Sequence, residues 1–421
     1  MFQRPSLVNT APMMTALFHT LLLTTLVAAK PTIDVRFEYE DGRFYVPVSA
    51  LQHGKPIDLG WFILDTGAGG VVFDSAVAQR LGLEVRAAGS QTGAGSGASK
   101  VGKVKGMPLK VDGVALSPDS ILVAPLDAQL APSTGRTVAG IIGSQFFHEH
   151  AVELDRGRNL LRVDPAEVEG GADLPVAGRR AIPFTLDDDL PWIPATLAIP
   201  GADSAMTTLK LIVDLGAKAP LLLTGPLLER IGGEARLGKH VLASLGAGVG
   251  GETRYWFTRV GALRAGADGA PLADSLVAGF SAFNTLRSSD YDGLLGAPLL
   301  DHFAVLFDYE RKLLWLSPRA DGAAAPEPLT AFDRAGMFLV ARDSVGVRRV
   351  IVRRVVAGSP AAEAGIKEGD ELTSLDGQPV SGMRLSAIRS RLRAGGVAGV
   401  GLGFLRGDAA SVRMLRLRDL L

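Results

Sequence analysis

Two aspartates occur in the same local sequence frame, and a pair of carboxyl groups could carry out acid–base hydrolysis. Asp65 ends the apolar run in FILDTGAGG, and Asp214 ends the apolar run in LIVDLGAKAP. Glycine follows each aspartate after one intervening residue, as Gly67 and Gly216. Two carboxyl groups within hydrogen-bonding distance share one proton, because both cannot ionise easily. One of them can then act as the base that activates water and the other as the acid.

A structural role is the alternative for each motif, since an aspartate at the end of a strand can accept N–H bonds from the following turn. An internal repeat favours catalysis. Residues 140–165 and 293–318 are a second pair of matching blocks, which follow the two aspartates at nearly equal spacing. The offset that places Gly143 on Gly296 also aligns Ala151, Val152, Asp155, Arg158, Leu160, Leu161 and Pro165 with identical residues. Two ordered blocks in each half indicate a duplicated lobe.

The elements that position the two aspartates are expected to be mainly β. Residues 35–48 alternate around an Asp-Gly turn, which predicts a hairpin, and residues 182–199 have a similar pattern. Asp74 and the Thr224–Pro226 segment are signals for a short helix after each aspartate. We therefore expect two small β-rich lobes, each with one or two short helices.

Composition narrows the classes of function. The chain has 421 residues, and Lys plus Arg balance Asp plus Glu at 44 each, so no net field attracts nucleic acid or an anionic membrane. Cysteine is absent, which excludes disulfides, thiol catalysis and thiolate metal sites.

The N-terminus predicts export. Arg4, the apolar segment 16–27 and the small residues at 27–29 are typical of a signal peptide covering residues 1–29. A buried N-terminal helix or a disordered tail is the alternative. No other stretch approaches the roughly 20 apolar residues of a membrane span, so we expect none in the mature chain.

The two halves resemble retropepsin-type aspartic proteases joined in one chain. The resemblance depends on Asp-Thr-Gly-Ala at 65–68 with Ile-Ile-Gly at 141–143, and on Asp-Leu-Gly-Ala at 214–217 with Leu-Leu-Gly at 294–296. It implies the bilobal acid-protease fold and an aspartic endopeptidase whose substrates are peptides or unfolded proteins. It assigns Asp65 and Asp214 as the catalytic pair, and the supporting loops as Thr66, Gly67, Ala68, Leu215, Gly216 and Ala217.

Leu215 departs from this pattern, because the family has Thr or Ser at that position. In the family the two hydroxyl groups cross between the lobes and tie the catalytic loops together. Thr66 can still do so, whereas Leu215 can only pack. The alternative function is therefore a catalytically weak or inactive protease-fold scaffold in which the third unit, described below, binds peptides.

Glycine-rich segments at 92–99 and 245–252 would be flaps that close over the substrate, and ordinary hairpin turns are the alternative. The flap residues implied are Gly93, Gly95, Gly97, Gly246, Gly248 and Gly250. His148 and His150 could suggest a metal, but they alternate on an expected strand and His150 is matched by Phe303. We therefore expect neither a metal site nor a cofactor.

A third unit follows a segment of linker composition at 321–328 and matches neither half. SPAAEAGIKEGDEL at 359–372 and LDGQPV at 375–380 resemble bacterial, circularly permuted PDZ domains. The resemblance implies binding of protein C-termini by strand addition beside a carboxylate loop at 335–338. Gly336, Met337, Phe338, Leu385 and Ile388 would contact the peptide; for the helical residues core packing is the alternative.

Two further features of the third unit concern strands. The GLGF string at 401–404 is expected to lie in a strand after the helix, and RRVIVRRV at 348–355 is expected to be an edge strand with solvated arginines. In sum, we expect a signal peptide at 1–29, protease lobe 1 at 30–175, lobe 2 at 176–318, a linker at 319–328 and a PDZ domain at 329–421. Family resemblance places the exported protein in a bacterial periplasm.

Overall fold

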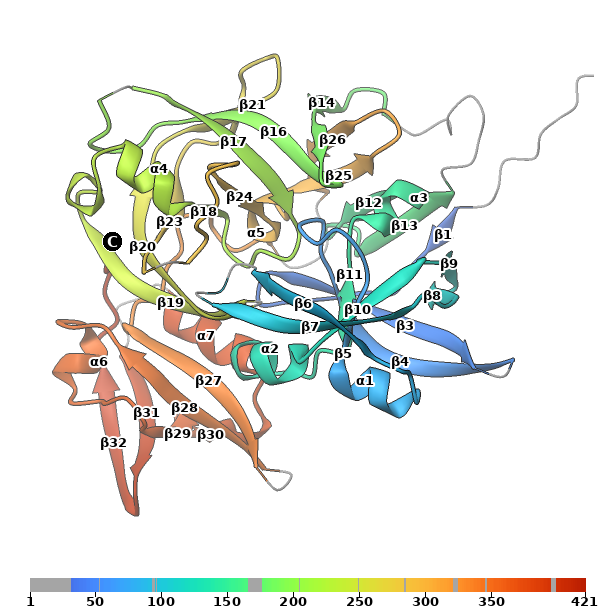
Figure 1. The fold of residues 1–421 in the computed structure, drawn as a ribbon. Helices are drawn as coiled ribbons and strands as arrows, with labels where there is room; N and C mark the ends of the chain where they lie inside the picture. Colours follow the sequence, from blue (N-terminus) through green and yellow to red (C-terminus); the bar gives the residue numbers. More distant parts are fainter. Residues whose placement is uncertain are drawn as a thin grey trace, which may run out of the picture.

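The computed structural model describes residues 32–421 except 53, 93–94, 96, 166–175, 204, 249, 284, 321–324, 345–346 and 395–398. The predicted signal peptide and Gly93 therefore lie outside the described residues. The described chain is mainly β, with two large sheets, a sheet between them and a fourth sheet in the C-terminal unit (Figure 1). None of its helices is long and apolar enough to cross a membrane.

The two large sheets have the same strand order, as the internal repeat predicts. In lobe 1 the order is β6 (Arg86–Thr92), β7 (Ala98–Lys105), β10 (Ser120–Ala124), β5 (Val72–Asp74), β11 (Gly140–Ile142), β4 (Lys55–Leu64), β3 (Arg43–Gln52), β8 (Leu109–Val111) and β9 (Val114–Leu116), with β2 (Glu38–Glu40) beside β3. In lobe 2 it is β19 (His240–Gly248), β20 (Gly251–Val260), β23 (Leu276–Ser281), β18 (Leu221–Leu223), β24 (Gly293–Gly296), β17 (Thr207–Asp214), β16 (Leu190–Leu197), β21 (Leu263–Ala265) and β22 (Pro271–Ala273), with β15 (Thr185–Asp187) beside β16. Every strand of one lobe thus has a counterpart in the other.

The third sheet joins the lobes and contains the second pair of matching blocks. Its order is β1 (Ile33–Asp34), β13 (Leu160–Pro165), β12 (His150–Asp155), β25 (Phe303–Asp308), β26 (Leu313–Pro318) and β14 (Arg180–Pro183). The central pair, β12 and β25, is antiparallel, and these are the strands that the repeat aligns. A pseudo-twofold axis therefore passes between them.

Short helices complete the lobes. The side chain of Asp74 accepts the Ala76 N–H at the start of α1 (Ser75–Arg80), and that of Thr224 accepts the Leu227 N–H at the start of α4 (Gly225–Arg230). Both caps were expected from the sequence. Further short helices are α3 (Gln145–Glu149), α5 (Ala297–Leu300) and the 3₁₀ turn η1 (Glu234–Arg236).

One helix breaks the symmetry between the lobes. In lobe 1, α2 (Leu126–Thr134) joins β10 to β11. The described residues of the equivalent connection in lobe 2, between β23 and β24, contain no helix. The asymmetry matters because α2 lies next to the C-terminal unit (Figure 1).

The C-terminal unit has its own hydrophobic core, which includes Leu339, Ile388 and Phe404. Its sheet order is β27 (Met337–Ser344), β28 (Val347–Val355), β29 (Glu371–Leu375), β31 (Val400–Arg406) and β32 (Ala409–Leu415), with β30 (Gln378–Pro379) beside β29. Its helical segments are α6 (Pro360–Glu363), η2 (Val380–Gly382) and α7 (Leu385–Arg393).

The GLGF string lies within β31, as expected. The expectation that residues 348–355 form an edge strand was wrong, because β28 pairs with β27 on one side and β29 on the other. Alternation of arginine and valine does not distinguish an edge strand from an inner strand with one solvated face. Circular permutation and the boundaries of the domains stay predictions.

Candidate active site

The two aspartates occupy equivalent places in the two sheets. Asp65 directly follows β4, and Asp214 is the last residue of β17. Each of these strands pairs in parallel with a strand of the second repeat block: Leu64 lies opposite Ile142, and Asp214 opposite Gly296. Strands β11 and β24, which belong to the second pair of repeat blocks, therefore hold the ends of β4 and β17 in place.

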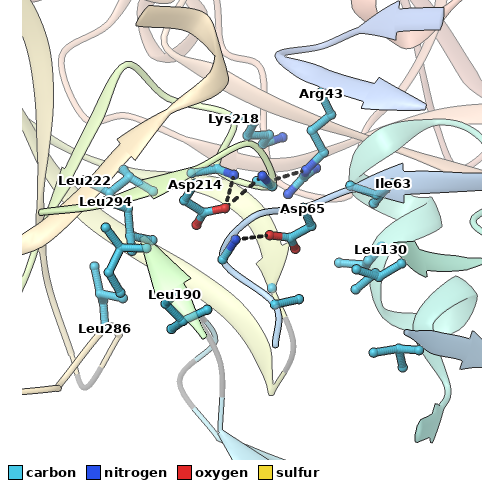
Figure 2. A pocket seen from close by; sticks show the side chains of 18 of the residues that line it. Arg43, Ile63, Asp65, Leu130, Leu190, Asp214, Lys218, Leu222, Leu286 and Leu294 are labelled. Atoms are coloured by element: carbon cyan, nitrogen blue, oxygen red, sulfur yellow. Dashed lines mark hydrogen bonds between the residues drawn. The ribbon is translucent and has the colours of Figure 1, made fainter. Parts of the chain in front are cut away.

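Both carboxylates accept N–H bonds from their own loops, as a structural role would require. Asp65 Oδ1 lies 2.9 Å from the Gly67 nitrogen, and Asp214 Oδ1 lies 2.8 Å from the Gly216 nitrogen. These bonds hold each carboxyl group in a fixed orientation. They do not account for the arrangement across the lobe interface, where the two groups face each other (Figure 2).

Each carboxyl group lies against the glycine of the opposite loop. A Cβ atom built on Gly67 would lie 2.6 Å from Cγ of Asp214, and one built on Gly216 would lie 2.4 Å from Cγ of Asp65. Real Cβ atoms essentially never approach other atoms below 3.0 Å. Glycine is therefore required at both positions for the two carboxyl groups to approach.

Burial sets the protonation behaviour of the pair. It raises the pKa of both carboxyl groups above the usual value for aspartate. The pKa of Asp214 is raised further, because the negative charge of nearby Asp65 adds to the effect of burial. Asp214 is buried, whereas Asp65 is half-buried. The two carboxyl groups therefore titrate as one pair that can hold a single proton.

Thr66 ties the two loops together with its hydroxyl group. It donates to the Val213 carbonyl at 2.7 Å and accepts the Leu215 N–H at 3.0 Å, so one side chain makes two bonds across the lobe interface. Leu215 is completely buried in the main hydrophobic core. The leucine thus replaces a potential hydroxyl contact by apolar packing while its backbone keeps the bond to Thr66.

Arg43, which the sequence analysis did not single out, lies beside the aspartates. Its Nε donates to the Gly216 carbonyl at 2.8 Å, and its positive charge lowers the pKa of both Asp65 and Asp214, against the larger effect of burial. Arg43 is only 8% exposed, and its Nη1 has no hydrogen-bond partner among the described residues. The available signal was a charged residue at the start of the otherwise apolar strand RFYVPV.

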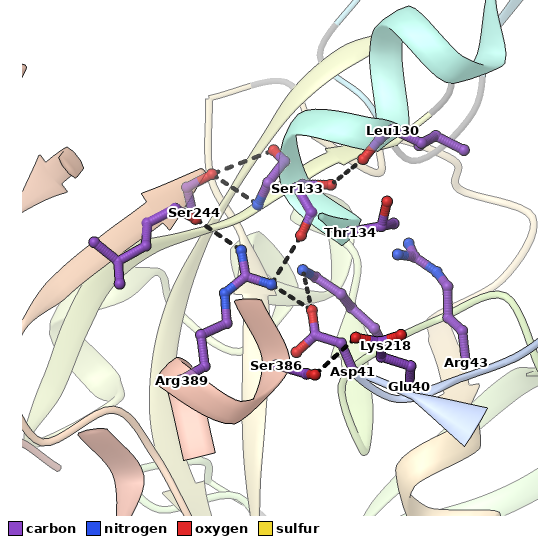
Figure 3. Close-up of polar contacts among 12 residues, drawn as sticks. Glu40, Asp41, Arg43, Leu130, Ser133, Thr134, Lys218, Ser244, Ser386 and Arg389 are labelled. Carbon is purple, nitrogen blue, oxygen red and sulfur yellow. Dashed lines mark hydrogen bonds and ion pairs between the residues drawn. The ribbon is translucent and has the colours of Figure 1, made fainter. Parts of the chain in front are cut away.

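A second buried pair links the lobes behind the Gly216–Ala217 loop. Lys218 Nζ lies 3.3 Å from Asp41 Oδ2, and both side chains are less than one-tenth exposed. Burial lowers the pKa of Lys218 to about 7, although the charge of Asp41 acts in the opposite direction. Asp41 also accepts a bond from Arg389 of the C-terminal unit (Figure 3).

The aspartates lie in a cleft of ≈ 480 Å³ between the lobes. Most of its wall is apolar, and Figure 2 shows the leucines around the pair. Its apolar residues include Ile63, Leu122, Leu130, Leu190, Leu222, Leu286 and Leu294, and Ala68 and Ala217 also line it.

Hairpins from both lobes meet beside the cleft. The Gly97 N–H donates to the Gly250 carbonyl at 2.9 Å, and Gly95 packs on the backbone of Gly250 and Gly251. Gly248 lines the cleft, while Gly246 packs against Ser133 of α2. The described glycines of the two segments thus touch at the ends of the β6–β7 and β19–β20 hairpins, and the function of these hairpins as flaps stays a prediction.

The residues predicted to bind a peptide in the C-terminal unit fall into two groups. Leu385, Ile388 and Met337 are buried in that unit's own core, whereas Phe338 is half-buried. Gly336 has a φ of +74° and donates its N–H to the Asp333 carboxylate. Their part in peptide binding stays a prediction.

One of the two histidines is placed differently from expectation. His148 lies in α3, not on a strand, and its Nε2 is 3.5 Å from Asp189 Oδ1; His150 begins β12 and contacts the Ala115 carbonyl. Local backbone bonds hold this short helix, since the N–H groups of Phe147 and His148 both donate to the Ser144 carbonyl. Among the described residues, no cluster of three or more potential ligands could hold a metal ion.

Comparison with known proteins agrees with this architecture. Residues 46–146 match the family model described as "Aspartyl protease", and residues 351–398 match the model described as "PDZ domain". The chain therefore combines an aspartyl protease domain with a PDZ domain, which confirms the predicted combination of these two kinds of domain. It is also similar to Rhophilin-1 from Homo sapiens, with 43% identity over 53 residues. That match covers 13% of this chain and 8% of Rhophilin-1.

Proposed function

We propose that this protein is an aspartic endopeptidase that hydrolyses peptide bonds with Asp65 and Asp214. The observation that carries the proposal is the reciprocal contact of each carboxyl group with the glycine of the opposite loop. Two lobes of equal topology bring two acids to one point, with one proton held between them. Few structural roles require two acidic groups to be buried together, because their mutual repulsion is unfavourable.

In the proposed reaction, ionised Asp65 accepts a proton from a water molecule that attacks the peptide carbonyl. Protonated Asp214 donates its proton to the carbonyl oxygen, which gives a gem-diol intermediate. Asp65 then passes the proton taken from water to the leaving nitrogen as the C–N bond breaks, and one gem-diol hydroxyl returns a proton to Asp214, which restores the pair. No covalent intermediate with the protein forms. Arg43 and Thr66 act as positioning residues, since they fix the loops that hold the carboxyl groups.

The proposed substrate is an extended peptide or unfolded protein with apolar side chains next to the cleaved bond. The apolar wall of the cleft favours such side chains, because their burial there removes them from water. The two touching hairpins would be flaps over the bound chain. Export to a bacterial periplasm and recognition of protein C-termini by the PDZ domain belong to the same proposal.

A cleavage assay tests this function. The purified chain is incubated with a denatured protein and a peptide library from acid to mildly alkaline pH, beside Asp65→Asn and Asp214→Asn variants. Cleavage by the parent and its loss in both variants supports the enzyme. Absence of turnover at every pH, together with retained peptide binding, would instead support the scaffold function that Leu215 suggests.

A further inference from the structure

The PDZ domain is docked on both protease lobes through charged contacts. Arg389 of α7 donates to Asp41 and to the Ser133 carbonyl of α2 in lobe 1, the latter at 2.8 Å (Figure 3). On lobe 2, Arg259 donates to the Leu421 carbonyl at 2.6 Å and pairs with Asp419. The domain therefore contacts both lobes.

A further contact of the PDZ domain holds the β19–β20 hairpin of lobe 2, whose end touches the β6–β7 hairpin of lobe 1. Glu252 is adjacent to the tip residue Gly251, whose neighbour Gly250 accepts the bond from Gly97. The Glu252 carboxylate lies 2.9 Å from Arg354 Nε and 3.6 Å from Arg353 Nη2, both on β28 of the PDZ domain. Movement of this hairpin away from the cleft must break these pairs or carry the PDZ domain with it.

The same docking engages the strand to which a PDZ ligand would add. β27 ends the sheet, and Leu339 lies opposite Val352. Val352 directs its N–H to the Asp370 carbonyl and its own carbonyl to the Gly369 N–H. Residues that face each other in an antiparallel pair direct their N–H and C=O groups either toward each other or both away. Since those of Val352 point away from β27, those of Leu339 point to the free edge of β27, where the Leu339 carbonyl accepts a bond from Arg389 Nη2 at 2.7 Å.

Lobe 1 covers the space beside this edge. Helix α2 packs against β27, and a Cβ built on Gly135, directly after α2, would lie 2.8 Å from Cβ of Leu385 in α7. The end of α2 thus contacts both walls of the β27–α7 groove. At the end of the groove, Gly336 and Met337 donate their N–H groups to the Asp333 side chain. The groups expected to bind a peptide are therefore used by the chain itself.

We propose that the docked PDZ domain is a latch that holds the lobe 2 flap closed, and that a peptide strand adding to β27 releases it. The two states exclude each other, because the peptide needs the Leu339 carbonyl and the space now taken by Arg389 and α2. Release separates Arg354 from Glu252 and frees the flap for substrate entry. This inference rests on the proposed function, since it concerns access to the same cleft.

Hydrogen exchange tests the latch without requiring activity. In the full chain, Glu252→Gln and Arg354→Gln are expected to speed amide exchange in residues 251–260 and 337–344 by about two- to fivefold, as expected for loss of an ion pair worth up to ~1 kcal/mol. The double variant should add little to Glu252→Gln, because that single variant already removes both ion pairs of this carboxylate. Arg349→Gln is the matched control, since Arg349 lies on the same strand but pairs with Glu371 inside the PDZ domain. Unchanged exchange in the flap would overturn the latch.

A reversible crosslink tests its effect on cleavage. The chain has no cysteine, so Glu252→Cys with Arg354→Cys introduces the only two thiols, which a short bis-methanethiosulfonate reagent can join. Cleavage of a denatured protein should fall about tenfold in the linked form, because only the open population accepts substrate, and recover on reduction. Full activity in the linked form contradicts the latch. A parent that cleaves nothing contradicts the proposed function instead, and the exchange experiment still decides on the latch.

Peptide retention tests the competition for β27. A pool of random hexapeptides with free C-termini is passed over the immobilised full chain, and an amidated pool serves as the control. Arg354→Gln, which leaves the groove residues unchanged, should retain more of the free-carboxylate pool than the parent, by about two- to fivefold. Equal retention by parent and variant would contradict the mutual exclusion.

Discussion

Gly67 of lobe 1 lies directly against the carboxyl group of Asp214 in lobe 2, at a distance that excludes any side chain at position 67. Gly216 has the same relationship to Asp65. These two contacts connect the duplicated sequence to its chemistry. The repeat supplies two equal loops, and the missing side chains let the loops approach until their acids can share a proton.

A methyl group at position 67 should therefore damage catalysis more than folding. Gly67→Ala must displace the Asp214 carboxyl group, and a shift of about 1 Å can slow a reaction by about 10²-fold. Gly70→Ala is the control, because a Cβ at that position on the same loop meets no atom within 4 Å. Steady-state cleavage rates, with circular dichroism as a check on the fold, measure the difference. Equal activity of the two variants would contradict the proposed role of Gly67.

Thr66 should stabilise the lobe interface through its hydroxyl group. Thr66→Val keeps the shape but leaves the Leu215 N–H and the Val213 carbonyl without this partner in the interior. Each unsatisfied buried group costs about 1–3 kcal/mol, so the free energy of unfolding should fall by that order. Urea denaturation measures the change, with Thr66→Ser as the variant that retains the hydroxyl. We expect the serine protein to be clearly more stable than the valine protein.

Cleavage should remain active up to a pH that is high for a pair of aspartates. Activity needs one proton on the pair, so it falls at acid pH when Asp65 is protonated and again when Asp214 loses its proton. Because the pKa of Asp214 is raised well above 3.8, the second fall should occur well above that pH. Arg43→Gln should move both limits to higher pH, since the arginine charge lowers the pKa of both groups. An upper limit at or below pH 3.8 would disagree with this arrangement.

The raised pKa values of Asp65 and Asp214 also make the free energy of unfolding depend on pH. A raised pKa means that the native state holds the proton more tightly than the unfolded chain does. The resulting stabilisation is present at acid pH and is lost as the pH rises from about 3.8 through the native pKa values.

Lys218 should make stability rise with pH above neutrality. Its pKa is about 7 in the native state and 10.5 in the reference state, so only the unfolded chain binds this proton between those values. The free energy of unfolding should then increase by about 1.4 kcal/mol per pH unit across this window. Urea denaturation at several pH values measures the slope, which Lys218→Met should remove and the exposed-site variant Lys55→Met should keep. A flat profile for the parent protein would show that Lys218 is charged throughout.

Sequence patterns predicted the parts of the fold that repeat or that follow local rules. The offset that sets Gly143 on Gly296 anticipated that β12 and β25 would be equivalent, and the caps at Asp74 and Thr224 marked real helix starts. The approach of Asp65 and Asp214 followed from duplication, because equal lobes place equal loops around one axis.

Contacts between segments far apart in the chain were not predictable in this way. The sequence around Arg43, Lys218 and Arg389 does not indicate their partners, because these depend on how the lobes and the PDZ domain dock. Helix α2 was also missed, since Pro132 lies inside it and its first residue follows Pro125 without a side-chain cap. Tertiary contacts with β19 and β27 accompany this helix and compensate for the weak local signal.

The most direct test of the central claim compares cleavage rates of Asp65→Asn, Asp214→Asn and the double variant with that of the parent protein. Asparagine keeps the size of each side chain but can neither exchange the shared proton nor serve as the base. Because the two acids act as one unit, we predict that each single variant loses nearly all activity and that the double variant is no slower than either. Cleavage at the parental rate by either single variant would contradict hydrolysis by this pair.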